Sequence, residues 1–428
     1  MALPEPAPAV EPRELRTENE VRDEVQRWVG DSWDPGLSLL EWRSLLVEEG
    51  WACPTWPKVW GGHGLPASFA QVVANTLAEL GVPGPPETVG MHLAVPTLLE
   101  HGSDELNQRL LRSTATGEIV WCQLFSEPAA GSDLAGLITR AERDGDEWVV
   151  SGQKVWNTGA AQADLGLLLA RTDWDVPKHQ GLTYFVLPMR QAAIEVRPLR
   201  QMNGHASFNE VFLDEARLPA SNVVGEVGNG WRAALTTLAH ERRLASSRRG
   251  GTAPARVGRA WDEALAEQVA ASEPHKWYPQ RAGRVDLLVD RAVATGTNPN
   301  AVVRQEIAKV LSAASAAKWS AERAVAARRL GRPPGPEGSL GKLSTSNIAR
   351  AASHAHSVMA GASGMLAGSD APLGGTITEI FVSVPGQSIA GGTDEIQHNI
   401  IAERILGLPK DPSSDAQLPF RAASERGR

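Results

Sequence analysis

Cysteine is scarce in this chain: its 428 residues include only Cys53 and Cys122, which lie far apart. Their separation matches no metal-binding or redox spacing, and so few thiols fit a reduced cytoplasm. No apolar run approaches the roughly 18 residues that a membrane span needs, and the longest candidate, 165–170, has the length of a strand. We therefore expect no metal site, no membrane span and a cytoplasmic location.

The chain also lacks an excess of positive charge. Its 50 Asp and Glu outnumber its 42 Lys and Arg, which gives a net charge of −8, so we expect no nucleic-acid partner and no anionic membrane partner. Apolar residues, by contrast, are plentiful. With 42% hydrophobic and 21% charged residues, the chain can build large cores, and global disorder is excluded.

The pattern of elements changes twice along the chain. Residues 14–119 carry mostly helical periodicity, whereas residues 120–225 carry six short β-type runs with no helix between them. Asp144 and Gly145, placed between two such runs, predict a hairpin turn. Because no helices separate the strands, we expect an antiparallel sheet in place of a βαβ arrangement.

Helical periodicity returns in residues 226–409 and is longest in 301–330. Residues 1–13 are rich in proline and are predicted to be a disordered lead-in, and the polar residues 410–428 are predicted to be a loose tail. The predicted fold class is therefore a multidomain α+β protein. It has an N-terminal helical domain, a central antiparallel β domain and a C-terminal helical bundle.

Two neighbouring segments carry the residues best suited to chemistry. FSEPAAGSD places small residues and the Ser132 hydroxyl directly after a predicted strand, where they could form a phosphate-binding nest, although an ordinary turn explains the same letters. GQKVWNTGA puts Trp156 and Thr158 two residues apart on one strand face. That pair suits a flat, hydrogen-bonding ring such as an isoalloxazine, whereas Trp156 alone is more typical of a core.

Four motifs in this order resemble the acyl-CoA dehydrogenase family: FSEPAAGSD, GQKVWNTGA, FNEVFLDEARLP and GGTDEIQHNIIAERILG. The similarity covers about residues 50–409. It implies the α–β–α fold of that family, an FAD cofactor, and introduction of an α,β double bond into an acyl-CoA thioester. It also implies a tetramer built on the C-terminal helices, either of identical chains or with a related chain, and an electron-transfer flavoprotein as the electron acceptor.

By this resemblance, three segments hold FAD. Residues 123–132 line the flavin and its pyrophosphate, Trp156 packs on the ring, and Thr158 lies near N5. Gly361 and Ala362 match a glycine pair that touches the ADP half from a neighbouring subunit, but here the second glycine is alanine. The implied cofactor-binding residues are Gln123, Phe125, Ser126, Gly131, Ser132, Trp156, Asn157, Thr158, Gly361, Thr393, Asp394 and Glu395. The last two acids also fit a helix start, where carboxylates complement the dipole.

The catalytic base departs from the commonest family pattern. Many members carry a glutamate immediately before the terminal Gly-Thr, where this chain has Gly391. Other members hold the base on the first helix of the C-terminal domain, which here contains Glu241 and Arg242 beside an apolar stripe that includes Leu235 and Leu238. We predict Glu241 as the base and Arg242 as its electrostatic support. The alternative is a structural ion pair of the two.

The same resemblance implies how a substrate would be held. The backbone N–H of Gly391 would donate to the thioester oxygen, and the expected substrate contacts are Ser132, Glu241, Arg242, Ala390 and Gly391. Because 390 and 391 carry almost no side chain, we predict a bulky, branched, ring-bearing or long acyl group. Three alternatives stay open: an FAD-binding partner subunit with a silent site, a flavin monooxygenase or oxidase on the same fold, and a non-flavin binding protein. The retained segments 126–132 and 156–158 argue against the third.

Overall fold

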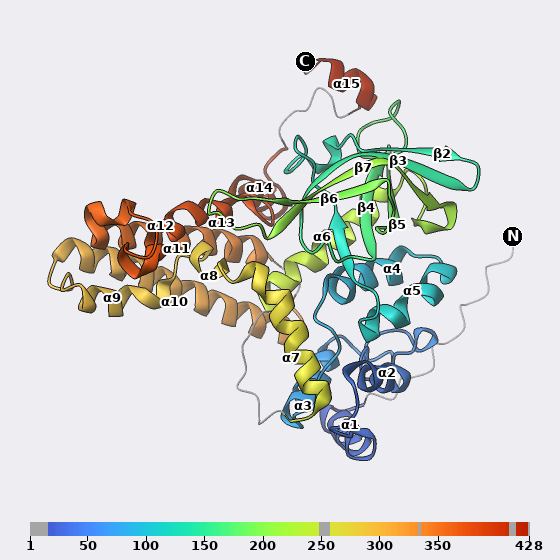
Figure 1. The fold of residues 1–428 in the computed structure, drawn as a ribbon, viewed down its shortest axis with the longest axis horizontal. Helices are drawn as coiled ribbons and strands as arrows, with labels where there is room; N and C mark the ends of the chain where they lie inside the picture. Colours follow the sequence, from blue (N-terminus) through green and yellow to red (C-terminus); the bar gives the residue numbers. More distant parts are fainter. Residues whose placement is uncertain (1–15, 248–256, 333–334, 411–416, 427–428) are drawn as a thin grey trace, which may run out of the picture. The chain divides into compact units, whose positions relative to one another are not determined.

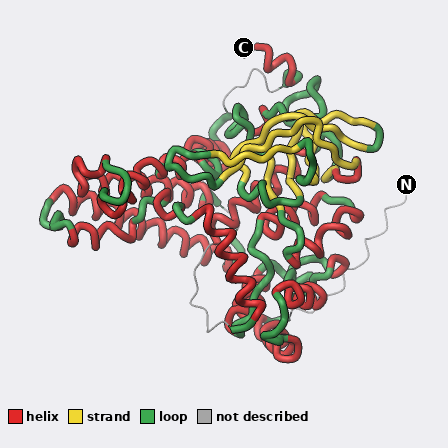
Figure 2. The backbone as a smooth tube through the Cα atoms, in the orientation of Figure 1, coloured by secondary structure: helices red, strands yellow, loops and turns green. Residues whose placement is uncertain are grey.

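The computed structural model describes residues 16–247, 257–332, 335–410 and 417–426, and Figures 1 and 2 show the path of the chain. The predicted lead-in lies outside the described residues. The chain divides into two compact units. The first comprises residues 1–87, 108–118 and 250–267, and the second comprises residues 88–107, 119–249 and 268–428.

The first unit is helical. Its elements are α1 (Glu18–Ser32), α2 (Leu39–Glu49), η1 (Lys58–Trp60), α3 (Ser68–Glu79), the end of α5 (Asp104–Thr116) and the beginning of α7 (Arg259–Ser272). Capping boxes at Thr17 and Ser38 begin the first two helices. Arg43 on α2 forms a bidentate ion pair with Glu267 on α7, its shorter bond being 2.7 Å. This pair helps to explain why residues 250–267 belong to the first unit.

One sheet forms the β part of the second unit (Figure 2). Its strands are β1 (Trp121–Leu124), β2 (Arg140–Asp144), β3 (Glu147–Asn157), β4 (Leu165–Arg171), β5 (Leu182–Pro188), β6 (Ile194–Leu199), β7 (Phe208–Pro219) and β8 (Val223–Val224). The order is β6-β7-β3-β2-β4-β5-β8, with β1 paired to β4. Asp144 faces Glu147 across the β2–β3 turn, which confirms the predicted hairpin.

A wholly antiparallel sheet had been expected, but the observed sheet is mixed. β1 and β2 both pair with β4 in parallel, while the other neighbours are antiparallel. β1 and β4 run parallel because the whole β2–β3 hairpin lies between them in sequence. β2 and β4 run parallel because β3, antiparallel to β2, carries the chain back before β4 begins. Side chains from both ends of the sheet, among them Cys122, Trp148 and Phe185, form its buried core.

Helices complete the second unit. They are η2 (Gly90–Ala94), α4 (Val95–His101), η3 (Leu134–Gly136), η4 (Ala220–Asn222), α6 (Gly230–Ser247), η5 (Glu273–His275), α8 (Tyr278–Arg281), η6 (Val285–Leu287), α9 (Leu288–Ala294), α10 (Ala301–Arg329), α11 (Glu337–Ala360), η7 (Gly361–Met365), η8 (Pro372–Gly375), α12 (Thr376–Ser383), α13 (Pro385–Ile389), α14 (Asp394–Ile400), η9 (Ile401–Ile405) and α15 (Phe420–Arg426). The predicted long helix is α10, and it runs beside α11 (Figure 1). Among the described residues, no helix has the length and apolar character to span a membrane.

The C-terminal tail differs from its prediction as a loose segment. Residues 411–416 lie outside the described part, but Pro419 pairs with Pro177, and α15 follows immediately. Phe420 is buried. A polar tail can be ordered in this way when one large apolar side chain and the main chain both find partners on a neighbouring element.

Candidate active site

The loop after β1 presents the small residues that suggested an anion site. Glu127 and Ala130 exchange two backbone hydrogen bonds of 3.0 and 3.1 Å, which close a tight turn. Gly131 and Ser132 follow this turn and are exposed, while Phe125 before it is buried against Tyr184. The loop thus exposes the backbone of Gly131 and the hydroxyl of Ser132. Buried Phe125 and the hydrogen-bonded turn hold it in place.

A buried ion pair supports this loop. Lys154 of β3 is fully buried, and its ammonium donates to Glu127 Oε1 (2.9 Å) and to the carbonyls of Phe125 (3.0 Å) and Leu169 (2.8 Å). The same carboxylate accepts from the amides of Ile138 and Thr139. Burial raises the pKa of Glu127, but Lys154 and these amides outweigh it, so the pKa lies below its ordinary value.

Trp156 lies in an irregular part of β3 and is exposed. The β3–β7 register shifts between Lys154 and Asn157, and Trp156 has a φ of +64°, a conformation that costs a bulky residue free energy. Its side chain is 55% exposed, with its ring edge-to-face against Phe208. The interpretation of Trp156 as a core residue is therefore wrong. The backbone is bent at some cost to hold a flat aromatic ring at the surface.

Asn157 joins this segment to β1. Its buried amide donates from Nδ2 to the carbonyl of Gln123 (2.7 Å), whereas its Oδ1 accepts no hydrogen bond from any described residue. A buried acceptor without a donor is unfavourable unless a bound molecule supplies one. Thr158 follows in a turn and is half-buried, so the bulge, not simple strand alternation, sets how it lies relative to Trp156.

Glu241 lies close to the same end of β1. Gln123 Nε2 donates to Glu241 Oε2 at 3.4 Å, and the Glu241 side chain is half-buried. The carboxylate predicted as the base and the first residue predicted to line the flavin are thus neighbours. The side chain of Arg242 lies outside the described residues, so its predicted role stays a prediction.

The buried face of α6 is not the predicted apolar stripe. Leu235 is 44% exposed, whereas Ala233, Ala234 and Thr237 are buried. The Thr237 hydroxyl contacts Thr97 Oγ1 (2.8 Å) and the Tyr184 hydroxyl (2.9 Å), which satisfies its polar atom. Small residues allow α6 to approach the sheet closely, and Glu241, one turn after Thr237, shares this face.

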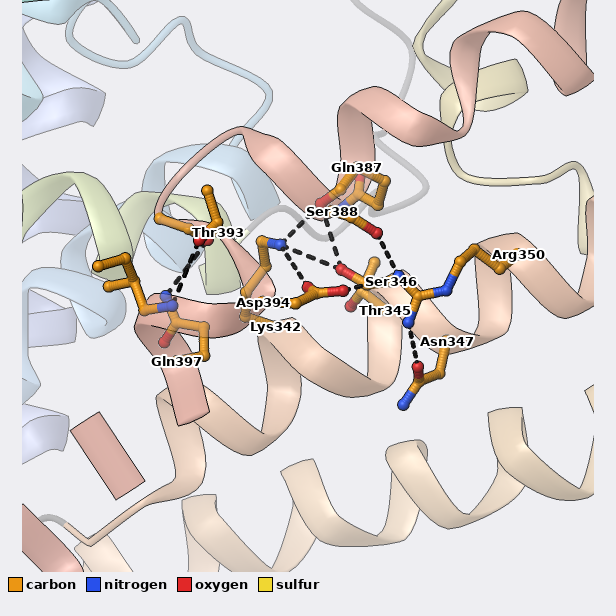
Figure 3. A network of polar contacts seen from close by, with 12 residues as sticks. Lys342, Thr345, Ser346, Asn347, Arg350, Gln387, Ser388, Thr393, Asp394 and Gln397 are labelled. Atoms are coloured by element: carbon orange, nitrogen blue, oxygen red, sulfur yellow. Dashed lines mark hydrogen bonds and ion pairs between the residues drawn. The ribbon is translucent and has the colours of Figure 1, made fainter. Parts of the chain in front are cut away.

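The terminal motif is held by its own acid (Figure 3). Asp394 is buried, and its carboxylate accepts from Lys342 (3.2 Å) and Arg350 (2.7 Å), both on α11. Burial raises the pKa of Asp394, but the hydrogen bonds from Arg350, Ser346 and Lys342 outweigh it and hold the pKa well below its ordinary range.

The other polar residues of this motif also face their own helix. The Thr393 hydroxyl accepts from Ile396 N (3.3 Å) and caps α14 (Figure 3). Glu395 lies in the first turn and is exposed. A cofactor contact from Asp394 would have to share a carboxylate that Lys342 and Arg350 already bind.

Backbone, not side chains, is what the preceding loop offers. Ala390 and Gly391 are exposed, and Gly391 has a φ of +68°. A Cβ built at Gly391 would meet no atom within 4 Å, so open space, not packing, surrounds it. Within the described residues its amide donates no hydrogen bond, so it is available to an external acceptor. Gly361, at the end of α11, is likewise exposed, with a φ of +54°.

Hydrogen bonds therefore bring together the ends of β1 and β3 with α6, through Gln123, Asn157 and Glu241. The residues of the terminal motif are organised separately, by α11. Sequence reasoning missed Lys154, Lys342 and Arg350 as the residues that hold these loops. The only sequence signal for Lys154 was a lysine flanked by strand residues in GQKVW, which could have suggested a buried partner for Glu127.

Comparisons with known proteins agree with this layout. The acyl-CoA dehydrogenase N-terminal, middle and C-terminal domain models match residues 16–118, 122–216 and 284–406. The chain is 32% identical to acyl-CoA dehydrogenase IpdE1 of Mycobacterium tuberculosis, over 92% of this chain and 98% of that protein. The chain belongs to the acyl-CoA dehydrogenase family. The predicted family and fold class are thereby confirmed, and members of this family are generally FAD flavoproteins.

Other relatives differ in how much of their length is shared. The chain is 38% identical to acyl-CoA dehydrogenase FadE34 of Mycobacterium tuberculosis, over 85% of this chain but only 46% of that protein. A solved steroid acyl-CoA dehydrogenase, Tcur3481-Tcur3483, is 25% identical with a TM-score of 0.63, covering 93% of this chain and 99% of that one. The ChsE4-ChsE5 complex from Mycobacterium tuberculosis is also 25% identical, with a TM-score of 0.57, covering 93% of this chain and 100% of that one.

Proposed function

We propose that this chain uses FAD to introduce an α,β double bond into a bulky, branched, ring-bearing or long acyl-CoA. The observation that carries the proposal is the strained and exposed Trp156. Two successive hydrogen bonds, through Gln123, link its neighbour Asn157 to Glu241. A surface that holds an aromatic plane against its backbone preference is organised for a flat ligand.

The residues present fit a flavin. Trp156 offers a face for stacking, and the unsatisfied Oδ1 of Asn157 offers a buried acceptor. Gly131 and Ser132 would hold the pyrophosphate, with Gln123, Phe125, Ser126 and Thr158 along the ring and Gly361, Thr393, Asp394 and Glu395 beside the rest of the cofactor. Bound FAD would supply the acceptor for the hydride that leaves Cβ of the substrate.

The chain's own residues would then activate the α-carbon. The Gly391 amide would donate to the thioester oxygen and stabilise the charge that develops there. Glu241, half-buried and hydrogen-bonded by Gln123, would take the α-proton, with Arg242 as electrostatic support. This division of labour needs no carboxylate in the loop that contains Gly391.

The open space around Gly391 supports the proposed substrate shape. Neither Ala390 nor Gly391 places bulk beside the reacting carbons, and extra buried volume favours larger apolar groups by about 0.8 kcal/mol per methylene. The steroid acyl-CoA dehydrogenase and the two-component complex among the similar structures agree with a ring-bearing substrate and with a related partner chain. We further propose a tetramer of identical or related chains, an electron-transfer flavoprotein as acceptor, and a cytoplasmic location, which two buried free thiols favour.

The test begins with the purified chain, alone and co-expressed with a related partner chain. FAD content is measured first, and anaerobic loss of the oxidised flavin spectrum is then followed with straight-chain, α-branched and ring-bearing acyl-CoA thioesters. The proposal predicts a yellow protein that bulky thioesters bleach. A protein that takes up no FAD contradicts the cofactor assignment, and preference for short straight chains contradicts the substrate shape.

One further outcome has its own structural motivation. Because Gly391 replaces the commonest catalytic carboxylate, a chain with a silent site would bind FAD without being bleached by any thioester, even with its partner. Rapid reoxidation by oxygen after bleaching would instead indicate an oxidase or monooxygenase.

A further inference from the structure

The C-terminal segment 417–426 is attached to the connection between β4 and β5. Phe420 N donates to the carbonyl of Val176 (2.9 Å), and Arg421 N donates to that of Trp174 (3.0 Å). Arg421 also forms an exposed ion pair with Asp175 (3.0 Å). Main-chain bonds in succession fix the register of the segment, so Phe420 is placed at a defined position on the β4–β5 connection.

Phe420 covers a buried charge. The guanidinium carbon of Arg171, at the end of β4, lies 3.6 Å from the centroid of the Phe420 ring, and both side chains are buried. Trp174 packs beside the ring, with a centroid distance of 5.6 Å. Within the described residues no carboxylate oxygen lies within ion-pair distance of Arg171. Glu127, Asp133 and Asp173 act on the guanidinium from beyond that distance, whereas the rings of Phe420 and Trp174 face it directly.

The inner side of Arg171 holds the candidate anion loop. Its N–H groups donate to the carbonyls of Ala135 (2.7 Å), Leu137 (3.2 Å) and Lys178 (3.2 Å). Ala135 and Leu137 lie three and five residues after Ser132, and Glu127 holds the same loop through Ile138 and Thr139. Burial lowers the pKa of Arg171 to about 10, so the group keeps its charge at neutral pH.

We propose that Arg171 and Phe420 are positioning residues for the loop that contains Gly131 and Ser132, so that the C-terminal segment sets how firmly this chain binds the pyrophosphate of its cofactor. The inference rests on the proposed function for the cofactor, whereas the mechanical link between Phe420 and the loop is independent of it. Removal of the ring would admit water to the guanidinium, which would then compete with the loop carbonyls for its N–H groups.

The test compares full-length Phe420→Ala with Phe420→Tyr, which keeps the ring, and with Arg421→Ala, which removes only an exposed ion pair on the same segment. Hydrogen exchange of the amides in 131–139 needs no cofactor. We expect it to accelerate about tenfold or more in Phe420→Ala and to stay near wild type in the other two. The dissociation constant for FAD should rise about tenfold in Phe420→Ala alone.

The outcomes separate the two proposals. If wild type takes up no FAD, the proposed function fails, and hydrogen exchange alone decides the role of Phe420. Unchanged exchange in 131–139 after Phe420→Ala overturns the mechanical link. Faster exchange with an unchanged FAD dissociation constant overturns the role in cofactor binding. If protection from hydrogen exchange is lost evenly over the whole chain, and Phe420→Tyr shows the same loss, Phe420 has a general structural role and the inference is also overturned.

Discussion

Two loops of this protein use their polar residues in opposite ways. In the loop around 126–139, buried Glu127 and Lys154 hold the backbone from beneath, and the residues suited to a ligand remain exposed. In the terminal motif the polar residues Thr393 and Asp394 hold the loop themselves, and the part left open is the backbone of Gly391. A motif residue can therefore matter because it holds a loop in place, in addition to any contact that it makes with a ligand.

The largest effect should follow from breaking the first support. Lys154→Met leaves the Glu127 carboxylate buried without its cation, and we expect it to lower the free energy of unfolding by about 3–5 kcal/mol. Urea denaturation measures this loss. The double variant with Glu127→Gln should recover much of it, because no uncompensated charge remains. A loss below about 1 kcal/mol in the single variant would mean that water already reaches the pair.

A smaller effect is expected from the second support. Asp394→Asn keeps the shape of the side chain but removes the charge that binds Lys342 and Arg350, so we expect a loss of about 1–3 kcal/mol. Because the folded pKa of Asp394 is lowered, its contribution is present above the unfolded pKa and is lost as pH falls through the acid range. The free energy of unfolding, measured between neutral and acid pH, should therefore decrease less steeply in Asp394→Asn than in wild type. Equal slopes in both proteins would contradict a stabilising role for the ion pairs of Asp394.

Trp156→Gly sharpens the contrast, because it should separate stability from binding. Glycine accepts a φ of +64° without strain, so we expect the cofactor-free chain to gain up to about 1 kcal/mol. FAD binding should weaken about tenfold or more, since the stacking face is removed. Trp148→Phe, in the buried core, is the control and should lower stability with little direct effect on FAD binding. If Trp156→Gly instead lowered the stability, packing of the Trp156 side chain would contribute more to the stability than its backbone strain costs.

The smallest effect should come from the bundle, away from both loops. His356 is buried, and Arg291 donates to its Nδ1 (3.1 Å) and to its carbonyl (2.9 Å). Burial, with Arg291 nearby, lowers the pKa of His356, so the neutral ring is favoured in the fold. Its contribution is complete above the unfolded pKa and decreases as pH falls below it. Between neutral pH and mild acid, the free energy of unfolding should decrease less in His356→Gln than in wild type. An identical decrease in both proteins would contradict this assignment.

Much of the fold follows from local patterns in the sequence. Helical periodicity, the hairpin signal at Asp144 and the order of the motifs predicted the α–β–α arrangement, and these features depend only on neighbouring residues. The parallel pairing of β1 with β4 and the attachment of Phe420 to the β4–β5 connection depend on contacts between distant segments, which no local pattern encodes. They could not have been predicted from spacing.

The candidate site divides in the same way. The exposed residues of the motifs could be named from the sequence, because the residue types themselves indicate which groups can bind a ligand. The role of Asp394 could not, since its partners Lys342 and Arg350 lie more than 40 residues earlier on α11. The face of α6 was also misjudged, because a helical wheel weighs hydrophobicity, whereas close packing here selected alanine and a hydrogen-bonded threonine.

The most direct test of the account is anaerobic flavin reduction in Glu241→Gln. The matched control is Glu226→Gln, an exposed glutamate just before α6. If Glu241 takes the α-proton, the variant keeps its FAD while reduction by a bulky acyl-CoA slows on the order of 10²-fold or more, and the control stays at the wild-type rate. Full flavin content with an unchanged rate in Glu241→Gln would contradict the central claim, because the base would then lie elsewhere.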